Sequence, residues 1–255
     1  TAICLDESII SLQSAEDALA LKATTIINIK PGRVGGYIES LKIQKMGFSE
    51  LIIVHTPETY LVDYIKGFDF GDLNVRMISW DKEPNYSAQI NHGAREAKSE
   101  WISFFEIDDE YSSIWFKNVD MYSKAYPDTQ VFLPIVVDTD AQGKFAGFTN
   151  EATFAANFTP EMGVLTNETL HDYQNFQTSG MVIKKESFLD FGLFKPSFKL
   201  TFGYELLLRL THNSIRIMSI PRIGYKHTNL RDGSIFWNYK NGDDRLTEEE
   251  VKFWI

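Results

Sequence analysis

Short apolar segments alternate with amphipathic segments along the first 110 residues of the chain. The apolar segments are rich in β-branched side chains, which is typical of strands covered on both faces. Predicted strands cover residues 24–30, 50–55, 74–79 and 101–105, and predicted helices cover residues 36–46 and 86–98. This alternation predicts a mostly parallel sheet flanked by helices, whose ligands bind beyond the carboxyl ends of the strands.

The pattern changes after residue 110. A strand over residues 131–137 is followed by a long polar stretch, residues 138–178, that carries many aromatic side chains. A connection of this length in a compact protein is usually a functional loop or lid, although its aromatic rings could simply pin an irregular loop to the core. Two further strands, residues 181–184 and 215–219, flank a predicted helix over residues 204–211. The second half is therefore expected to form a smaller, separate part of the same domain.

Composition and charge narrow the class of partner. The chain has 255 residues, 44% of them hydrophobic, and a formal net charge of −10. A surplus of acidic residues argues against a nucleic-acid partner, because neutralising phosphates requires Lys and Arg. No apolar run approaches the roughly 20 residues that span a bilayer, so no membrane-spanning segment is expected. Cys4 is the sole cysteine, which favours a reducing compartment, and we expect a cytoplasmic protein.

Four carboxylates crowd the end of the predicted strand over residues 101–105. They are Glu106, Asp108, Asp109 and Glu110. Clustered carboxylates repel one another unless a cation compensates, and Mg²⁺ or Mn²⁺ binds through carboxylates together with substrate phosphates. An acidic turn exposed to solvent is the alternative interpretation. Because the cluster follows the carboxyl end of a predicted strand, it lies at the sheet edge where a nucleotide diphosphate would bind.

The stretch over residues 91–109 resembles a characteristic segment of glycosyltransferase family 2, which has the GT-A fold. In that family an Asn-x-Gly helix start, an alanine-containing helix and an apolar strand end in Asp-x-Asp-Asp. The chain matches this order without a gap from Asn91 to Asp109, with Glu106 in place of the first Asp. The resemblance implies that Glu106 faces the nucleotide and metal region, that Asp108 ligates the metal, and that Asp109 lies beside the sugar as a catalytic residue.

Two positions depart from the family pattern. The family follows its second strand with Asp-Asp-Gly-Ser, which holds the base, but here the residues are His55, Thr56, Pro57 and Glu58. His55 or Thr56 could contact the base instead, although a buried or capping histidine is an equal alternative. The Glu-Asp pair that supplies the family's catalytic base falls on Phe202 and Gly203. Glu205, two residues further on, is the remaining candidate for the base, and a carboxylate at a helix start is the alternative.

Residues 225–234 resemble the closing loop of the family. There a histidine and a basic residue meet the diphosphate, which implies that His227 is a metal ligand and that Lys226 or Arg231 balances phosphate charge. A structural histidine in a loop is the alternative for His227.

These features predict one GT-A-like, Rossmann-like α/β domain over residues 1–255. A nucleotide-sugar-binding half covers residues 24–110, an acceptor-binding half covers residues 111–234, and residues 235–255 form a tail that continues in a longer protein. The expected function is metal-dependent transfer of a sugar from a nucleotide-diphosphate sugar, with UDP favoured, to a carbohydrate or glycan acceptor, with inversion implied by the resemblance. Mn²⁺ or Mg²⁺ is the expected cofactor. The main alternative is a catalytically impaired module that binds a nucleotide sugar or glycan; a nucleotidyltransferase ranks third.

Overall fold

The computed structural model describes residues 4–5, 26–27, 48–67, 70, 73–106, 109–151, 163–229, 231–232, 234–242 and 245–255. Its first half contains β1 Cys4–Leu5, β2 Ile26–Ile27, β3 Leu51–His55, α4 Thr59–Lys66, β4 Val75–Ser79, α5 Tyr86–Glu96, β5 Trp101–Ser103, β6 Glu110–Tyr111 and α6 Trp115–Ala125. The second half contains β7 Val131–Thr139, β8 Phe145–Thr149, β9 Val164–Leu165, α7 Asn167–Asp172, β10 Val182–Lys184, α8 Lys185–Asp190, α9 Phe202–His212, β11 Ile217–Thr228, α10 Ile235–Asn241 and α11 Glu248–Trp254.

The predicted strand–helix–strand pattern is present in the first half. Strands β3 and β4 pair in parallel over five residues each, with His55 opposite Ser79 at their carboxyl ends. Helix α5 lies against β3 at Gly93, where a Cβ atom would come within 3.1 Å of Val54. The helix begins where the Asn85 side chain accepts a hydrogen bond from the backbone N–H of Ala88, which is a standard N-cap interaction. The predicted helix over residues 36–46 lies outside the described residues, as does most of the predicted strand over residues 24–30.

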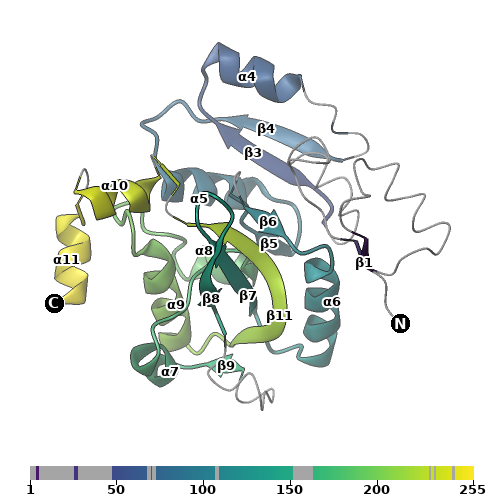
Figure 1. Cartoon of the computed structure of the whole chain (residues 1–255), viewed down its shortest axis with the longest axis vertical. Helices are drawn as coiled ribbons and strands as arrows, with labels where there is room; N and C mark the ends of the chain where they lie inside the picture. The colour runs from purple at the N-terminus through teal and green to yellow at the C-terminus, as the bar shows by residue number, and fades with distance from the viewer. Residues whose placement is uncertain are drawn as a thin grey trace.

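A seven-stranded sheet forms the centre of the molecule (Figure 1). Its strands run in the order β5-β10-β7-β11-β6, with β8 added beside β7 and β9 beside β11. Only β7 and β11 pair in parallel within this sheet, and the other pairs are antiparallel. The predicted mixed α/β class is therefore correct. The strand directions differ from the mostly parallel arrangement that was predicted. Strands β6, β8, β9 and β10 run antiparallel to their neighbours, and antiparallel strands need no helical crossover between them.

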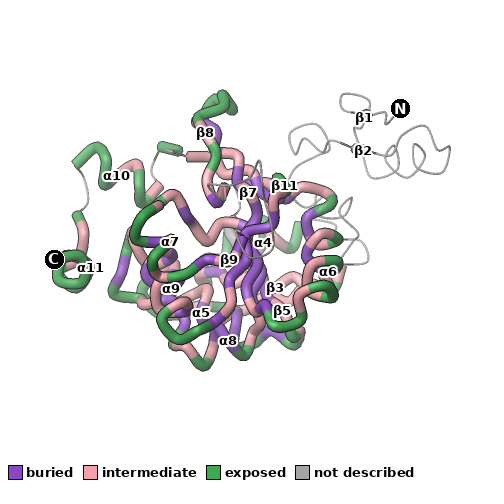
Figure 2. The backbone as a smooth tube through the Cα atoms, turned by 90° about the horizontal axis from the view of Figure 1, so that it is seen from below, coloured by how far each residue is buried: buried purple, intermediate pink, exposed green. Residues whose placement is uncertain are grey.

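Two apolar cores cover the two faces of this sheet, and successive strand residues alternate between them. Val131 and Leu133 of β7 pack with α8 and α9, whereas Phe132 and Val136 pack with Trp115 of α6. Burial on both faces explains why β7 reads as an unbroken apolar run. Figure 2 shows these buried strands as the purple centre of the molecule, with exposed residues on the surrounding helices. The sheet is thus a rigid platform for the residues at its edges.

The stretch predicted as one long loop, residues 138–178, contains regular structure in its described parts, residues 138–151 and 163–178. Strand β8 forms a hairpin with the end of β7, and β9 and α7 follow. Helix α7 begins with a capping box between Thr166 and Thr169, in which each side chain bonds to the backbone of the other residue. Polar residues in this stretch therefore cap and connect short elements, and the apolar periodicity of these elements is too short to be recognised in the sequence.

The C-terminal helix packs against the start of α9. The buried carboxylate of Glu250 in α11 accepts hydrogen bonds from the backbone N–H groups of Leu200 and Thr201, at 2.8 and 3.0 Å, and from the Thr201 hydroxyl. Trp254 donates its indole N–H to the same hydroxyl at 3.0 Å. The last described helix is thereby joined to the domain. Across the described parts of the chain, no helix has the length and apolar character needed to cross a membrane.

Replacing Gly180 should test the close packing of its backbone against the ring of Tyr225 in β11. Gly180 has a φ of +70°, and a Cβ atom there would lie 2.7 Å from the ring of Tyr225. Gly180→Ala should lower the free energy of unfolding by about 2–4 kcal/mol, through overpacking and left-handed strain. Gly143→Ala is the control: its φ is +79° but nothing lies within 4 Å, so only the strain, about 1–2 kcal/mol, remains. Equal losses in urea unfolding would contradict this account.

Candidate active site

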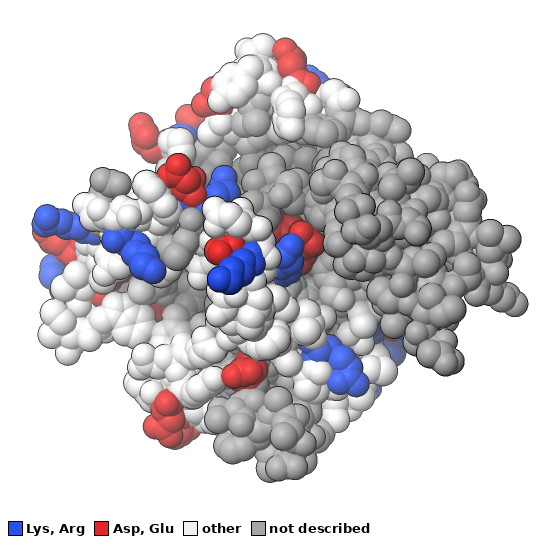
Figure 3. Space-filling view, viewed as in Figure 1, with Lys and Arg blue, Asp and Glu red and all other residues white. Residues whose placement is uncertain are grey.

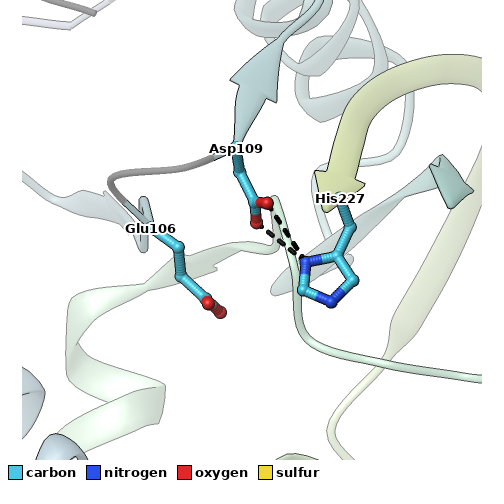
Figure 4. A group of neighbouring side chains, drawn as sticks. All are labelled: Glu106, Asp109 and His227. Carbon is cyan, nitrogen blue, oxygen red and sulfur yellow. Dashed lines mark hydrogen bonds and ion pairs between the residues drawn. The ribbon is translucent and has the colours of Figure 1, made fainter. Parts of the chain in front are cut away.

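Glu106, Asp109 and His227 meet at one edge of the central sheet (Figure 4). Each offers one ligand atom, and these atoms lie within 4.8 Å of one another. Glu106 and Asp109 come from the turn that joins β5 to β6, and His227 comes from the last part of β11. Two segments that are far apart in the sequence are therefore brought together by strand pairing, with Lys226 of β11 opposite Glu110 of β6.

Asp109 holds the turn and β11 together. Its side chain is buried, with 1% of the residue exposed. One carboxylate oxygen accepts a hydrogen bond from the backbone N–H of Thr228 at 2.9 Å, and the other lies 3.0 Å from Nδ1 of His227. The backbone N–H of Asp109 donates to the carbonyl of Glu106 at 3.1 Å, which closes the turn. A buried carboxylate is stable here because charged and polar donors surround it.

Glu106 is positioned by two tyrosines. Tyr86, at the start of α5, donates its hydroxyl to the Glu106 carboxylate at 3.3 Å, and the backbone N–H of Glu106 donates to the Tyr225 hydroxyl at 3.2 Å. Burial raises the pKa of both tyrosines well above 10, and the nearby carboxylates raise it further. Both phenols therefore stay protonated and neutral at any physiological pH, and Tyr86 remains a donor toward Glu106.

His227 is held in its charged form by the acidic groups around it. Burial alone would lower the pKa of this imidazole, but the hydrogen bond and charge of Asp109 raise it, with further contributions from Glu106 and Asp138, to about 9. Asp138 is the cross-strand partner of His227, so their side chains lie on the same face of the parallel pair β7 and β11. Burial raises the pKa of Asp138, although a hydrogen bond from Gln177 opposes this effect. At neutral pH His227 is therefore protonated, and its positive charge interacts with the side chains of Asp109, Glu106 and Asp138.

One predicted phosphate-binding residue, Lys226, lies beside this site in the sequence and pairs with Glu110, and one predicted metal ligand cannot be placed. Lys226 forms an ion pair with Glu110 at 2.9 Å, and both side chains are partly exposed. Arg231 is exposed, three residues beyond the end of β11. Asp108 lies outside the described residues. The assignments of Lys226 and Arg231 to phosphate, and of Asp108 to the metal, stay predictions.

His55 and Thr56 lie where β3 ends, at the carboxyl edge of the β3–β4 pair. His55 is buried, and its Nδ1 lies 2.8 Å from the carbonyl of Thr56, which fixes the ring. The carbonyl of His55 accepts a hydrogen bond from the backbone N–H of Trp80 at 2.7 Å. This position fits the predicted base-binding edge, and the contact of either residue with a nucleotide base stays a prediction.

Glu205 lies in a buried ion-pair cluster. It has 2% exposure and pairs with Arg209 at 2.7 Å and with Lys195 at 3.1 Å. Burial raises the pKa of its carboxyl group, but the charges and hydrogen bonds of Arg209 and Lys195 outweigh this effect, and the resulting pKa is lowered. Its role as catalytic base stays a prediction. These contacts favour the alternative, a carboxylate that stabilises the start of α9 and the segment before it.

Sequence reasoning missed Tyr86, Tyr225 and Asp138 as residues of the site. Tyr86 is the first residue of a predicted helix, and no periodicity distinguishes it from a solvent-exposed tyrosine. Tyr225 and Asp138 acquire their positions from the pairing of β11 with β6 and β7. The available signal was that Asp138 directly follows the predicted strand over residues 131–137 and that Tyr225 begins the stretch that resembles the closing loop of the family.

Comparison with known proteins identifies the family. A family model described as glycosyl transferase family 2 matches residues 30–188, more than half of the chain. The chain therefore belongs to glycosyl transferase family 2, as the stretch ending in Asp109 predicted.

Solved structures confirm the GT-A fold. The chain is similar to S. aureus TarS 1–349 in complex with UDP, with 14% identity and a TM-score of 0.54 over 74% of this chain and 54% of that chain. Against the same fragment in complex with UDP-GlcNAc, the identity is 13% and the TM-score 0.54, over 92% of this chain and 59% of that chain. The chain thus spans just over half of these TarS chains.

A short stretch has a different set of relatives. It is 60% identical over 43 residues to an N-succinylamino acid racemase from Amycolatopsis sp., which is 17% of this chain and 12% of that protein. It is 59% identical over 46 residues to an o-succinylbenzoate synthase from Bacillus subtilis (strain 168), 18% of this chain and 12% of that protein. The chain spans about an eighth of the length of these relatives, so the similarity is local and does not define its family.

The pairing of Asp109 with His227 predicts a stability that depends on pH. Because the pKa of His227 is raised, the folded state binds this proton more tightly than the unfolded state does. The contribution of the pair to the free energy of unfolding is therefore complete below pH 6.5 and is lost as the pH rises through about 9. Asp109→Asn in EDTA should move the pKa of His227 down toward 6.5, measured by NMR titration with His227→Gln to assign the resonance. His212→Gln, which removes an exposed imidazole, should leave the titration of His227 unchanged. An unchanged His227 pKa in Asp109→Asn would contradict the pairing.

Glu205→Gln should separate a structural carboxylate from a catalytic base. Removing one partner of a buried ion pair leaves Arg209 poorly compensated, and we expect a loss of about 3 kcal/mol in the free energy of unfolding at pH 7. Glu186→Gln, at an exposed position in α8, is the matched control and should cost little. Full stability together with abolished sugar transfer would instead support Glu205 as the base.

Proposed function

We propose that this chain is the catalytic domain of a metal-dependent glycosyltransferase, which moves a sugar from a nucleotide-diphosphate sugar to an acceptor hydroxyl. The observation that carries the proposal is the cluster of Glu106, Asp109 and His227 at the sheet edge of a family 2 chain. Two carboxylates and an imidazole whose ligand atoms lie within 4.8 Å of one another are a group of side chains that could hold a cation, which supports the proposal. The site takes Glu106 and Asp109 from the predicted donor half, and His227 from the predicted acceptor half.

The residues of the cluster suit Mn²⁺ or Mg²⁺. Carboxylate oxygens are preferred ligands of both cations, and an imidazole nitrogen suits a first-row transition metal. Glu106, Asp109 and His227 would hold the cation, together with Asp108 if the resemblance to the family extends to that residue. When bound, the cation would stabilise negative charge on the diphosphate leaving group.

His227 links cation binding to pH. A histidine ligates a metal only in its neutral form, so binding must release the proton that His227 carries below pH 9. Asp109 would then exchange its interaction with the imidazolium for one with the cation, while the N–H of Thr228 continues to orient it. Cation affinity should therefore increase as the pH rises toward 9.

UDP is the nucleotide that we favour. The TarS complexes that share this fold contain UDP and UDP-GlcNAc, and His55 and Thr56 lie at the edge where a base would bind. Lys226 and Arg231 are proposed to balance the phosphates. On the described part of the face seen in Figure 3, lysines and arginines lie among acidic residues and form no broad basic surface, so these individual side chains would balance the phosphates. For Lys226, phosphate binding would require exchange of its ion pair with Glu110.

A catalytically impaired module that binds a nucleotide sugar is the second candidate. Phe202 and Gly203 stand where the family has its Glu-Asp pair, and Glu205 is engaged by two cations. Both candidates require the donor site, whereas only the enzyme breaks the bond between sugar and diphosphate. Release of UDP from UDP-GlcNAc, UDP-Glc or UDP-Gal without an acceptor is therefore the assay that distinguishes them. Inversion at the anomeric carbon remains an expectation from the family.

Thermal unfolding with UDP, GDP, CDP and dTDP, each with Mn²⁺ and with EDTA, tests the donor site. A ligand at about 100 times its Kd adds roughly 2.7 kcal/mol, and each kcal/mol raises the Tm by about 2–4 °C in a chain of this size. We expect a rise with UDP and Mn²⁺ that EDTA abolishes. Asp109→Asn and Glu106→Gln should lose the rise relative to their own ligand-free Tm, and Asp120→Asn, at an exposed position in α6, should keep it. No rise with any nucleotide would refute the donor site.

A further inference from the structure

A buried carboxylate of β7 lies beside the cation cluster. Asp138 is 6% exposed and is the register partner of His227 in the parallel pair of β7 and β11. Neighbouring strands lie about 4.8 Å apart, and the side chains of register partners share one face of the sheet. Within the described residues, no lysine or arginine forms an ion pair with Asp138, whereas Glu205 pairs with two such side chains. The Asp138 carboxylate is therefore not neutralised by a basic side chain of the described chain.

Asp138 stands outside the group that could hold the cation. The ligand atoms of Glu106, Asp109 and His227 lie within 4.8 Å of one another, and among the described residues Asp138 does not join this group. The charge of Asp138 nevertheless interacts with those of His227 and Asp109. Asp138 also belongs to the predicted acceptor half of the chain, residues 111–234. The carboxylate is thus adjacent to the cluster, on a strand of the acceptor half, without being one of the three ligands.

Hydrogen bonds fix the direction of this carboxylate. The side-chain nitrogen of Gln177 donates to Oδ1 of Asp138 at 3.3 Å and to the hydroxyl of Thr149, and the side-chain oxygen of Gln177 accepts from Ser179 at 2.9 Å. The backbone N–H of Gln177 donates to the Asn150 side chain at 2.7 Å, which holds the amide in place. Neutral donors therefore orient Asp138 without cancelling its charge, as suits a group that must accept a proton.

The segment that carries Gln177 also fills the place where the family has its Glu-Asp pair. Gly203, at the second position of that pair, is buried, and a Cβ atom there would lie 2.7 Å from the hydroxyl oxygen of Thr178. Thr178 directly follows Gln177, so two consecutive residues contact the start of α9 and Asp138. A carboxylate side chain at residue 203 would collide with Thr178, whereas Asp138 presents a carboxylate on the other side of the same segment.

We propose that Asp138 is the general base of the transfer reaction. The inference rests on the proposed function, because a base is needed only if a hydroxyl attacks the sugar. The hydroxyl oxygen forms a bond to the anomeric carbon, the bond between that carbon and the diphosphate breaks with its electron pair on UDP, and the hydroxyl proton passes to the Asp138 carboxylate. Glu205 then keeps the stabilising role that its ion pairs favour.

Release of UDP from UDP-GlcNAc, UDP-Glc or UDP-Gal tests this role, with Mn²⁺ present and water as the acceptor. Water must lose a proton as it attacks, so Asp138→Asn should lower the rate by about 10²–10⁴-fold, although the new side-chain oxygen can still accept from Gln177. Asp140→Asn is the matched control two residues further along. It keeps an oxygen for the backbone N–H groups of Gln142 and Lys144, and it should release UDP at the unaltered rate.

Sodium azide distinguishes a general base from a residue that only supports the fold. The azide ion is a nucleophile without a proton, so its attack on the anomeric carbon needs no base. In Asp138→Asn and Asp138→Ala, azide should therefore raise UDP release on the order of 10-fold or more over sodium chloride at the same concentration. The glycosyl azide product is detected by mass spectrometry. Azide should change the rate of the unaltered chain little, and it cannot repair a damaged fold.

Several results would overturn the assignment of Asp138. UDP release at the unaltered rate in Asp138→Asn would do so, and so would a lower rate that azide restores in neither variant. Loss of the Mn²⁺-dependent rise in Tm with UDP in Asp138→Asn would instead show that this carboxylate holds the cation or the donor. A response to azide in Glu205→Gln, without one in the Asp138 variants, would identify Glu205 as the base.

The unaltered chain distinguishes this inference from the proposed function. If it releases UDP from one of the three donors but the Asp138 variants do not respond as expected, only the assignment of the base fails. If it shows the rise in Tm with UDP and Mn²⁺ but releases no UDP from any donor, transfer itself fails together with the base. The impaired module that binds a nucleotide sugar would then be supported.

Discussion

The candidate active site depends on one buried carboxylate. Asp109 joins the turn after β5 to the end of β11 through Thr228 and His227, and its burial makes those partners obligatory. Together with the hydrogen bond from Glu106 to Tyr225 and the pairing of β6 with β11, it fixes the turn that carries Glu106 against the strand that carries His227. The same carboxylate sets the charge of the imidazole, so the geometry and the electrostatics of the site have a common origin.

The sequence predicted the architecture where the apolar pattern had a clear period. The strands now called β3, β4 and β7 and the helices α5 and α9 lie close to their predicted ranges, because each buries an apolar face long enough to recognise. Antiparallel pairing of β6 and β10 was not predicted, because the hydrophobic pattern of a short strand does not depend on whether its neighbour runs parallel or antiparallel. The hairpin of β7 and β8 was also missed, because Phe145 and Phe148 are three residues apart and a register shift in the hairpin interrupts the alternation expected of a strand.

The residues of the candidate site were partly predictable. Glu106, Asp109 and His227 were identified through the resemblance to the family, and the structure brings all three together. The surroundings of each residue could not be derived, because Tyr86, Tyr225 and Asp138 reach the site only through tertiary pairing. Glu205 shows the opposite case: its place in the sequence suggested a catalytic base, and its burial between Lys195 and Arg209 favours a role in stability.

The contact between Glu250 and the start of α9 links the end of the chain to the site wall. Glu250 satisfies N–H groups immediately before α9, whose first residue, Phe202, packs against Tyr86, the donor to Glu106. The sequence pattern predicted residues 235–255 as a tail of the single domain, with no contact assigned to it. Glu250 thus supports, through the start of α9, the ring that packs on Tyr86, and a recombinant fragment that ends before Glu250 would leave the N–H groups of Leu200 and Thr201 without this carboxylate.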